Sequence, residues 1–289
     1  MNNIYVNELS LHGQYNSWEQ FLMQNDKFIR TLRWIKNNKE HYELYKKTEL
    51  YCSFVTKDEK LYEIRGKKFQ LENNDKARLL KSLLLSLQND PPYWDSGEIA
   101  QNGIYHVNGR DISGSSIAEA AQAGQYLLSF ADQEYIDKVL VVLHELEKLR
   151  VPSIFSFAYL SKMLYESGSI DINEYVKRFY AGTRLEFGKI EQEYGLQYLE
   201  KEEVDDCLRN FDRFVSHENW DNILKDNSLV YKAYTPSQKE KDWFRNSKYK
   251  DMKIDKFRCV NPKRCFGYRE GDKFIVLRIE RDHKISDNG

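Results

Sequence analysis

Apolar residues recur at helical spacing in the first ninety residues of the chain. A helix is expected to begin at Ser17, with Gln20 at the capping-box position, because the apolar residues that follow share one helical face. A second helix is expected after Asp75, where leucines stand at i, i+3, i+4 and i+7 until Pro91 ends the run. Residues 4–11 instead read as a strand.

Turn signals and capping residues divide the middle of the chain. A short helix is expected at Ser116, which can cap it with Glu119 in the reciprocal position. Strands are expected within 50–64 on either side of the turn at 56–60, near 104–107, at 126–130 and at 228–234. Further helices are expected at about 133–149, 153–166, 171–181, 186–195 and 201–214.

The last unit has the clearest pattern. Three short antiparallel strands are expected at 256–260, 264–269 and 273–281, with a hairpin turn at Glu270-Gly-Asp272. Because side chains alternate along a strand, the third strand should present two different faces. One face should hold Ile275, Leu277 and Ile279, and the other Phe274, Val276, Arg278 and Glu280.

These elements predict an α+β protein. We expect a mixed α/β region at 1–130, a helical region at 131–227, and a small basic antiparallel β unit at 228–289, which can pack together as one globule. The chain has 289 residues, of which 41% are hydrophobic, with 20 Tyr and 15 Phe. A disordered or collagen-like chain is thereby excluded, and a core of this size needs no disulfide for stability.

Nothing in the sequence points to a membrane or to a secretory route. No apolar run approaches the roughly 20 residues that a membrane helix needs, and the first residues lack the basic and apolar regions of a signal peptide. A cytoplasmic location is therefore expected. The four cysteines should be reduced there, and the spacing of Cys259 and Cys265 matches no common zinc motif.

Charge is distributed unevenly although the net charge is only −1. Residues 239–289 hold 15 Lys and Arg against 9 Asp and Glu, whereas residues 186–226 hold 12 acids and 5 bases. A basic end can contact phosphates, but it can equally dock on its own acidic neighbour.

The basic end resembles the end of RelE/ParE-type bacterial toxins, whose twisted sheet binds and often cuts RNA. The matching stretch is Phe257-Arg258, then 264–269, then 274–283, about 45 residues of the chain. No family is recognised for residues 1–235. The resemblance implies an endoribonuclease that acts without a metal or cofactor.

Such chemistry needs cations on the phosphate, a general base for the 2′-hydroxyl and an acid for the leaving oxygen. Arg278 is the candidate for phosphate stabilisation. Tyr268 is the candidate for base stacking or for proton donation. His283 is the candidate for general acid–base catalysis, because a histidine titrates near neutrality. The candidate substrate-binding residues are Arg258, Arg264, Arg269, Arg281 and Lys284.

Other motifs offer weaker alternatives. Asp111-Ile-Ser-Gly-Ser115 matches a metal-ion adhesion motif, and Ser115 with Ser116 could hold a phosphate at a helix N-terminus. His144-Glu145 lacks the second histidine of a zinc protease, because position 148 is Lys. Asp95 and Glu98 lie in one loop and could join a metal site.

The leading hypothesis is a bacterial toxin or phage-defence effector that acts on RNA through its basic end, with a regulator, antitoxin or complex subunit as partner protein. The alternative is a non-enzymatic protein-interaction subunit of a complex. A second alternative is a metal-dependent nuclease at Asp95 and Glu98.

Overall fold

The computed structural model describes residues 2–69, 74–97, 101–236 and 238–282. Its contacts divide the chain into two units, Met1–Met163 and Leu164–Gly289. This division falls inside the region expected to be helical. The α+β class is confirmed, and so is the small antiparallel sheet at the C-terminal end.

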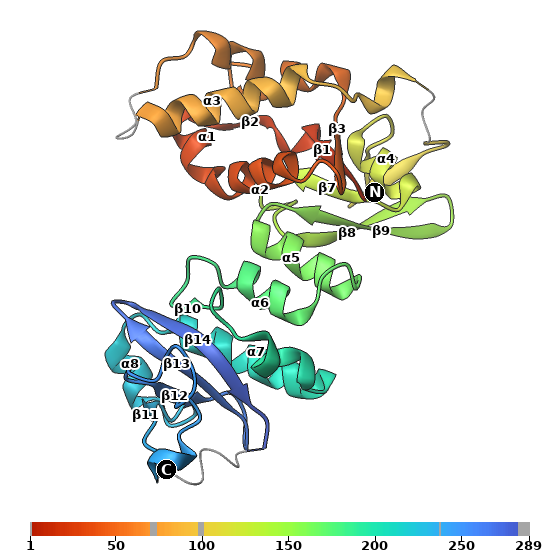
Figure 1. Ribbon diagram of the computed structural model, residues 1–289. Helices are drawn as coiled ribbons and strands as arrows, with labels where there is room; N and C mark the ends of the chain where they lie inside the picture. The colour runs from red at the N-terminus through yellow and green to blue at the C-terminus, as the bar shows by residue number, and fades with distance from the viewer. Residues whose placement is uncertain (1, 70–73, 98–100, 237, 283–289) are drawn as a thin grey trace. The chain divides into compact units, whose positions relative to one another are not determined.

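Within its described residues, the first unit contains a seven-stranded mixed sheet (Figure 1). Four parallel strands occupy one part of it, and three antiparallel strands continue it beyond β9. The order is β3 (Tyr42–Tyr45), β1 (Asn2–Asn7), β7 (Tyr126–Ser129), β9 (Glu147–Ile154), β8 (Lys138–His144), β5 (Tyr105–Val107) and β6 (Arg110–Asp111). A separate pair joins β2 (His12–Tyr15) and β4 (Phe54–Thr56).

Helices cover both faces of the parallel strands. Helix α4 packs on the face that carries Tyr5 and Leu127, and α2 contacts β7 and β3 from the other side, where Phe28 stacks on Phe130 at 4.1 Å. Burial on both faces explains the consecutive apolar residues in the middle of β1 and β7, such as 4–6 and 126–128. The helices of this unit are α1 (Trp18–Gln24), α2 (Asp26–Asn37), α3 (Asn74–Asn89), α4 (Ser116–Ala123) and α5 (Phe157–Glu166), which ends just past the division.

Several predicted boundaries are confirmed and others are wrong. Ser17 caps α1 and accepts a hydrogen bond from Gln20 N at 3.2 Å, as the capping pattern predicted. The cap of α4 is Ser115, one residue before the predicted Ser116. Only one strand forms in 50–64, because Leu61–Gly66 is a 3-10 helix.

The predicted helix at 133–149 is wrong. That stretch forms β8 and the start of β9, joined by a tight turn at Glu145, whose φ is 52°. Along β8, buried Leu140 and Val142 alternate with exposed Val141 and Leu143, as expected for a strand. This alternation cannot be read from the sequence, because the exposed positions are apolar as well.

The second unit is built on a five-stranded sheet within its described residues. The hairpin predicted at 270–272 is confirmed, with Gly271 at a φ of 61°. The order is β10 (Leu185–Glu186), β14 (Lys273–Glu280), β13 (Arg264–Glu270), β12 (Asp255–Arg258) and β11 (Lys232–Ala233), with β10 parallel to β14 and the others antiparallel. The helices are α6 (Ile172–Phe179), α7 (Lys201–Ser216) and α8 (Trp220–Lys225).

The predicted helix at 186–195 is also wrong. After β10 the chain passes through 3-10 turns at 192–194 and 196–198, and Glu191 N donates to Leu277 O at 2.9 Å. The backbone of this segment therefore follows the edge of the sheet. Gly188 and Gly195 disfavour a helix there.

Both faces of this sheet are buried. One face packs on α6, α7 and α8 through residues such as Phe211 and Phe257 (Figure 1). The other is covered by the loop-rich segment 234–254, which contributes Tyr234, Phe244 and Tyr249. The sheet is therefore an internal layer.

A β-bulge corrects the predicted faces of the last strand. The register shifts at Phe266 and Gly267, so that Phe266 pairs with Arg278 and Gly267 with Val276, and Leu277 is the extra residue. Beyond the bulge the alternation is inverted. Arg278 thus joins the face of Leu277, and Ile279 packs on the opposite face with Val276.

Candidate functional site

The acidic segment of the second unit pairs with the basic sheet. Lys263 Nζ lies 2.7 Å from Glu203, Lys273 Nζ lies 3.7 Å from Glu186, and Arg281 lies 3.3 Å from Glu203. The charge asymmetry of the sequence is thus partly neutralised inside one unit. A basic sheet paired in this way presents less charge to a phosphate than its composition indicates.

Arg278 is held in an aromatic cage. Its guanidinium carbon lies 4.4 Å from the ring centre of Phe244, 4.5 Å from that of Tyr194 and 5.1 Å from that of Trp243. It donates hydrogen bonds to the Glu191 carboxylate and to the carbonyl of Trp243. The residue is only 5% exposed, so it connects the sheet to the two segments that pack on it.

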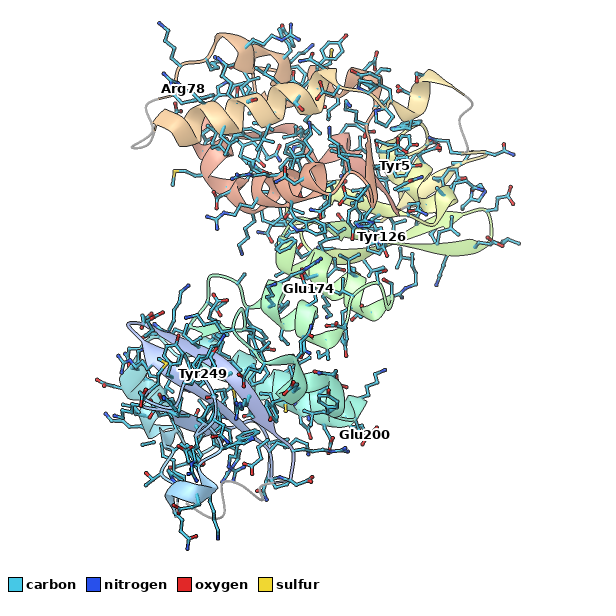
Figure 2. The ribbon with its side chains drawn as sticks, viewed as in Figure 1. Tyr5, Arg78, Tyr126, Glu174, Glu200 and Tyr249 are labelled. Atoms are coloured by element: carbon cyan, nitrogen blue, oxygen red, sulfur yellow. The ribbon has the colours of Figure 1, made fainter. Side chains whose placement is uncertain are left out.

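Tyr268 is buried as well. It lies on the same face as Arg278, packed near Tyr249, and is 6% exposed. Its hydroxyl oxygen accepts a hydrogen bond from Lys189 Nζ at 2.6 Å, and this bond raises the pKa of Lys189. Figure 2 shows Tyr249 within the C-terminal unit and Glu200 at the start of α7. The ring of Tyr268 is therefore not free to stack on a base.

The structure brings Arg258 and Arg264 onto this face but places Arg269 elsewhere. Arg264 pairs across the strands with Arg258, and its Nη1 donates to the carbonyls of Pro262 and Lys263 at 2.9 and 3.0 Å. Arg258 is half-buried, and its Nε is buried without an acceptor among the described residues. Arg269 stacks 4.1 Å above the Trp220 ring on the helical side.

The candidate residues of the sheet are therefore not gathered on one exposed surface. Of these residues, Arg278, Tyr268 and Arg264 are each at most 9% exposed. The bulge and the covering segment 234–254 cause this burial, and neither follows from a simple alternation of side chains. His283 and Lys284 lie outside the described residues.

Exposed positive charge is found instead on the covering segment. Between 241 and 253 the chain carries five basic residues and two acids. All five basic side chains are exposed, and no carboxylate of a described residue lies within 4.0 Å of any of them. These residues, named here the basic segment, are Lys241, Arg245, Lys248, Lys250 and Lys253.

The basic segment is fixed in place by its own aromatic residues. Phe244 and Tyr249 are 1% and 5% exposed and pack on the sheet, while Trp243 N donates to the Tyr234 hydroxyl oxygen at 3.0 Å. The charged side chains between them consequently face solvent from an anchored backbone. Sequence reasoning counted these residues in the basic end, but it placed the binding surface on the strands.

The loop carboxylates do not form a metal centre in the part of the chain that the structure describes. Asp95 accepts hydrogen bonds from Thr48 N and Oγ1 at 2.8 and 2.7 Å, and Glu98 lies outside the described residues. No group of three or more His, Cys, Asp or Glu side chains is arranged to hold a metal among the residues searched.

The N-terminus of α4 is already occupied by the side chain of Glu8. Ser116 N donates to Glu8 Oε1 at 3.0 Å, and burial raises the pKa of this glutamate. A phosphate on Ser115 and Ser116 would compete with that carboxylate. In the neighbouring motif, Asp111 Oδ1 accepts from Ser113 N at 2.9 Å, which closes a local turn.

The remaining candidates are structural. His144 lies on β8, not on a helix, and stacks on Tyr105 at 4.1 Å. Cys259 and Cys265 are fully buried free thiols, and burial raises the pKa of each. Neutral buried thiols of this kind are unreactive.

The carboxyl ends of the parallel strands, where open α/β sheets commonly bind ligands, are filled by their own polar residues. Asn7 Nδ2 donates to Ser129 Oγ at 2.9 Å, and the Ser129 and Ser153 hydroxyls are 2.7 Å apart. This buried network links the carboxyl ends of β1, β7 and β9.

Comparison with known proteins does not identify the chain. No family model, no curated protein and no solved structure matches it. In the described part of the chain, no helix is both long and apolar enough to cross a membrane.

Proposed function

We propose that the C-terminal unit binds RNA through the basic segment. One observation carries the proposal: five exposed basic side chains stand together on an anchored backbone, with no carboxylate of a described residue in ion-pair contact. On the sheet, by contrast, Arg264 and Arg278 are buried and Lys273 is paired with Glu186, while Arg269 is exposed beside Trp220. The positive charge that remains for a partner is thus concentrated at 241–253.

This arrangement suits a phosphate backbone better than a specific base. Lysine ammonium groups act as point charges and carry no base-reading geometry, so binding should depend little on sequence. The resemblance of the C-terminal strands to RelE/ParE-type toxins favours RNA as the nucleic acid. The binding free energy should be mainly electrostatic, and affinity should therefore fall steeply as salt is added.

RNA cutting without a metal, as in a toxin or phage-defence effector, is the finer form of the proposal. The burial of Arg278 and Tyr268 argues against these two as the groups that touch the scissile phosphate. A cutting activity would draw on the basic segment for binding and on other groups for proton transfer. Incubating the protein with RNA in EDTA distinguishes this form from binding alone.

The test compares two triple variants in fluorescence anisotropy with a labelled single-stranded RNA at low salt. Lys248→Glu/Lys250→Glu/Lys253→Glu should weaken binding by about tenfold or more, because three phosphate contacts become repulsive. A matched control reverses three exposed lysines of the first unit, Lys27, Lys57 and Lys148. Equal losses in both triple variants, or none in the first, would refute the assignment.

The alternative of an interaction subunit is favoured by an apolar patch on the β8–β9 hairpin. Val141, Leu143 and Leu146 are 45%, 42% and 102% exposed, although the opposite face of β8 is packed. Contiguous exposed apolar residues of this kind mark protein contacts. In this case Leu143→Glu would abolish co-purification with a partner protein and leave RNA affinity unchanged.

A further inference from the structure

The first unit contains a cavity of about 230 Å³ between α2, β3 and the end of α3. Its walls are apolar where Ile35, Leu87 and Pro92 contribute. Its ionisable lining residues are three lysines and two acids, namely Lys36, Lys39, Lys46, Glu43 and Asp90. A concave apolar site with a few convergent polar groups is the usual form of a small-molecule site.

Lys46 is the most buried of these cations. It follows β3, and its carbonyl accepts a hydrogen bond from Trp94 N at 3.1 Å, which fixes the backbone. The residue is 2% exposed, and its Nζ lies 4.5 Å from the ring centre of Tyr93. Asp90 acts on its ammonium electrostatically, but no described residue lies within hydrogen-bond or ion-pair distance of it.

The carboxylate of Asp90 is already engaged by other groups. Ser86 Oγ donates to Asp90 Oδ2 at 2.5 Å, and Lys36 Nζ lies 3.5 Å from the same oxygen and also donates to Ser86. The Ser86 hydrogen bond, with the help of Lys36, keeps the pKa of Asp90 below its usual range.

The other acid that lines the cavity is also engaged. Glu43 accepts a hydrogen bond from the Tyr45 hydroxyl at 2.8 Å. Lys39 adds a further positive charge at the exposed rim. The cavity therefore has more cationic groups than free carboxylates.

This excess of positive charge in the cavity means that the charged form of Lys46 destabilises the folded protein. Burial, reinforced by the nearby Lys36 and only partly opposed by Asp90, lowers the pKa of Lys46 to about 8. A buried ammonium without an acceptor is destabilising, so packing alone does not account for a lysine at this position. An anionic ligand would supply the missing acceptor and the opposite charge.

We propose that this cavity binds the oxyanion head, a phosphate or a carboxylate, of a small organic ligand through Lys46 and Lys36. The apolar walls would receive the body of the ligand. The volume is below the roughly 300–1,000 Å³ of drug-sized sites, which restricts the ligand to a small metabolite. The site lies in the first unit and does not depend on RNA binding by the second.

The first test uses the unmodified protein. Lysine side chains labelled with carbon-13 at Cε are titrated by NMR in sodium chloride, and then with inorganic phosphate or acetate added at constant ionic strength. One lysine resonance should titrate far below the others in chloride and shift to higher pH with either anion. If the resonance of Lys46 does not respond to phosphate or acetate, the proposal is overturned.

A pair of variants provides the second test. Phosphate should raise the Tm of the wild-type protein by a few degrees in a saturable manner, relative to chloride, because it binds only the folded state. Lys46→Met should remove this shift, whereas Lys27→Met, which removes an exposed charge from α2, should retain it. A saturable shift that persists in Lys46→Met would place the anion elsewhere and refute the site.

Discussion

The role of Arg278 separates a structural account of the C-terminal sheet from a catalytic one. Replacing Arg278 by Ala removes the guanidinium from a cage of three rings and leaves the Glu191 carboxylate and the Trp243 carbonyl without their donor. Breaking a buried ion pair costs about 3–5 kcal/mol. Each cation–π contact adds about 0.5–2 kcal/mol.

The lower end of the range for a buried ion pair, about 3 kcal/mol, applies to Arg278. The Glu191 side chain is 27% exposed, so water can partly solvate it after the change. We therefore expect Arg278→Ala to reduce the free energy of unfolding of the second unit by about 3 kcal/mol. With a urea m-value of about 2 kcal/mol/M, the midpoint should fall by about 1.5 M.

The assay must report on the second unit alone. Hydrogen exchange at increasing urea, read by mass spectrometry on peptides covering 264–280, follows β13 and β14 directly. Arg281→Ala is the matched control. Its side chain is 45% exposed and its partners are surface glutamates, so the loss should stay within about 1 kcal/mol.

A different outcome would contradict the structural role of Arg278. If Arg278→Ala leaves the exchange midpoint unchanged but abolishes RNA binding or cutting, Arg278 acts on substrate and the cage is incidental. A loss of both would follow from unfolding, and Arg278→Lys, which keeps the charge without the planar fork, should then restore part of each.

Three further predictions concern other positions. Gly267→Ala should unfold the second unit in a urea titration, because the new Cβ would lie 2.0 Å from Ile275 O at the bulge; wild-type stability would refute this. Burial alone would raise the pKa of Asp226, but hydrogen bonds from Arg213 and His217 lower it, so its contribution is fully present above about pH 4 and is lost progressively as the pH falls toward the lowered pKa. Asp226→Asn should cost about 2 kcal/mol at pH 7 and clearly less at pH 2, and an equal cost at both pH values would contradict the assignment. The lowered pKa of Lys46 means that the unfolded chain binds the proton of Lys46 more tightly than the folded chain does. The free energy of unfolding of the wild-type protein should therefore rise from about pH 8 to 10. Lys46→Met should lack this rise when unfolding is measured as a function of pH.

Local signals in the sequence predicted the parts of the fold that local interactions decide. The cap at Ser17, the strand at 126–129 and the hairpin at 270–272 all follow from residues within a few positions of each other. The β8–β9 hairpin was mistaken for a helix, because leucines and valines at 139–149 satisfy both periods. Only tertiary pairing decides between the two structures.

The candidate site was harder to predict for a different reason. The bulge that moves Arg278 to the opposite face depends on the register of two strands, which no single strand encodes. The burial of Arg278 and Tyr268 depends on a segment that returns across the sheet at 234–254. Lys46 was overlooked because its significance lies in what surrounds it, and those residues come from α2, β3 and α3.

The central claim, that the basic segment and not the sheet carries the phosphate-binding charge, is tested most directly by the salt dependence of RNA affinity. For single-stranded RNA the logarithm of the association constant falls with the logarithm of salt by about 0.7 for each phosphate contact, so five contacts predict a slope of about −3.5. Lys248→Glu/Lys250→Glu/Lys253→Glu should flatten this slope by about 2. A wild-type slope near zero, or a slope that the triple variant leaves unchanged, would contradict the account.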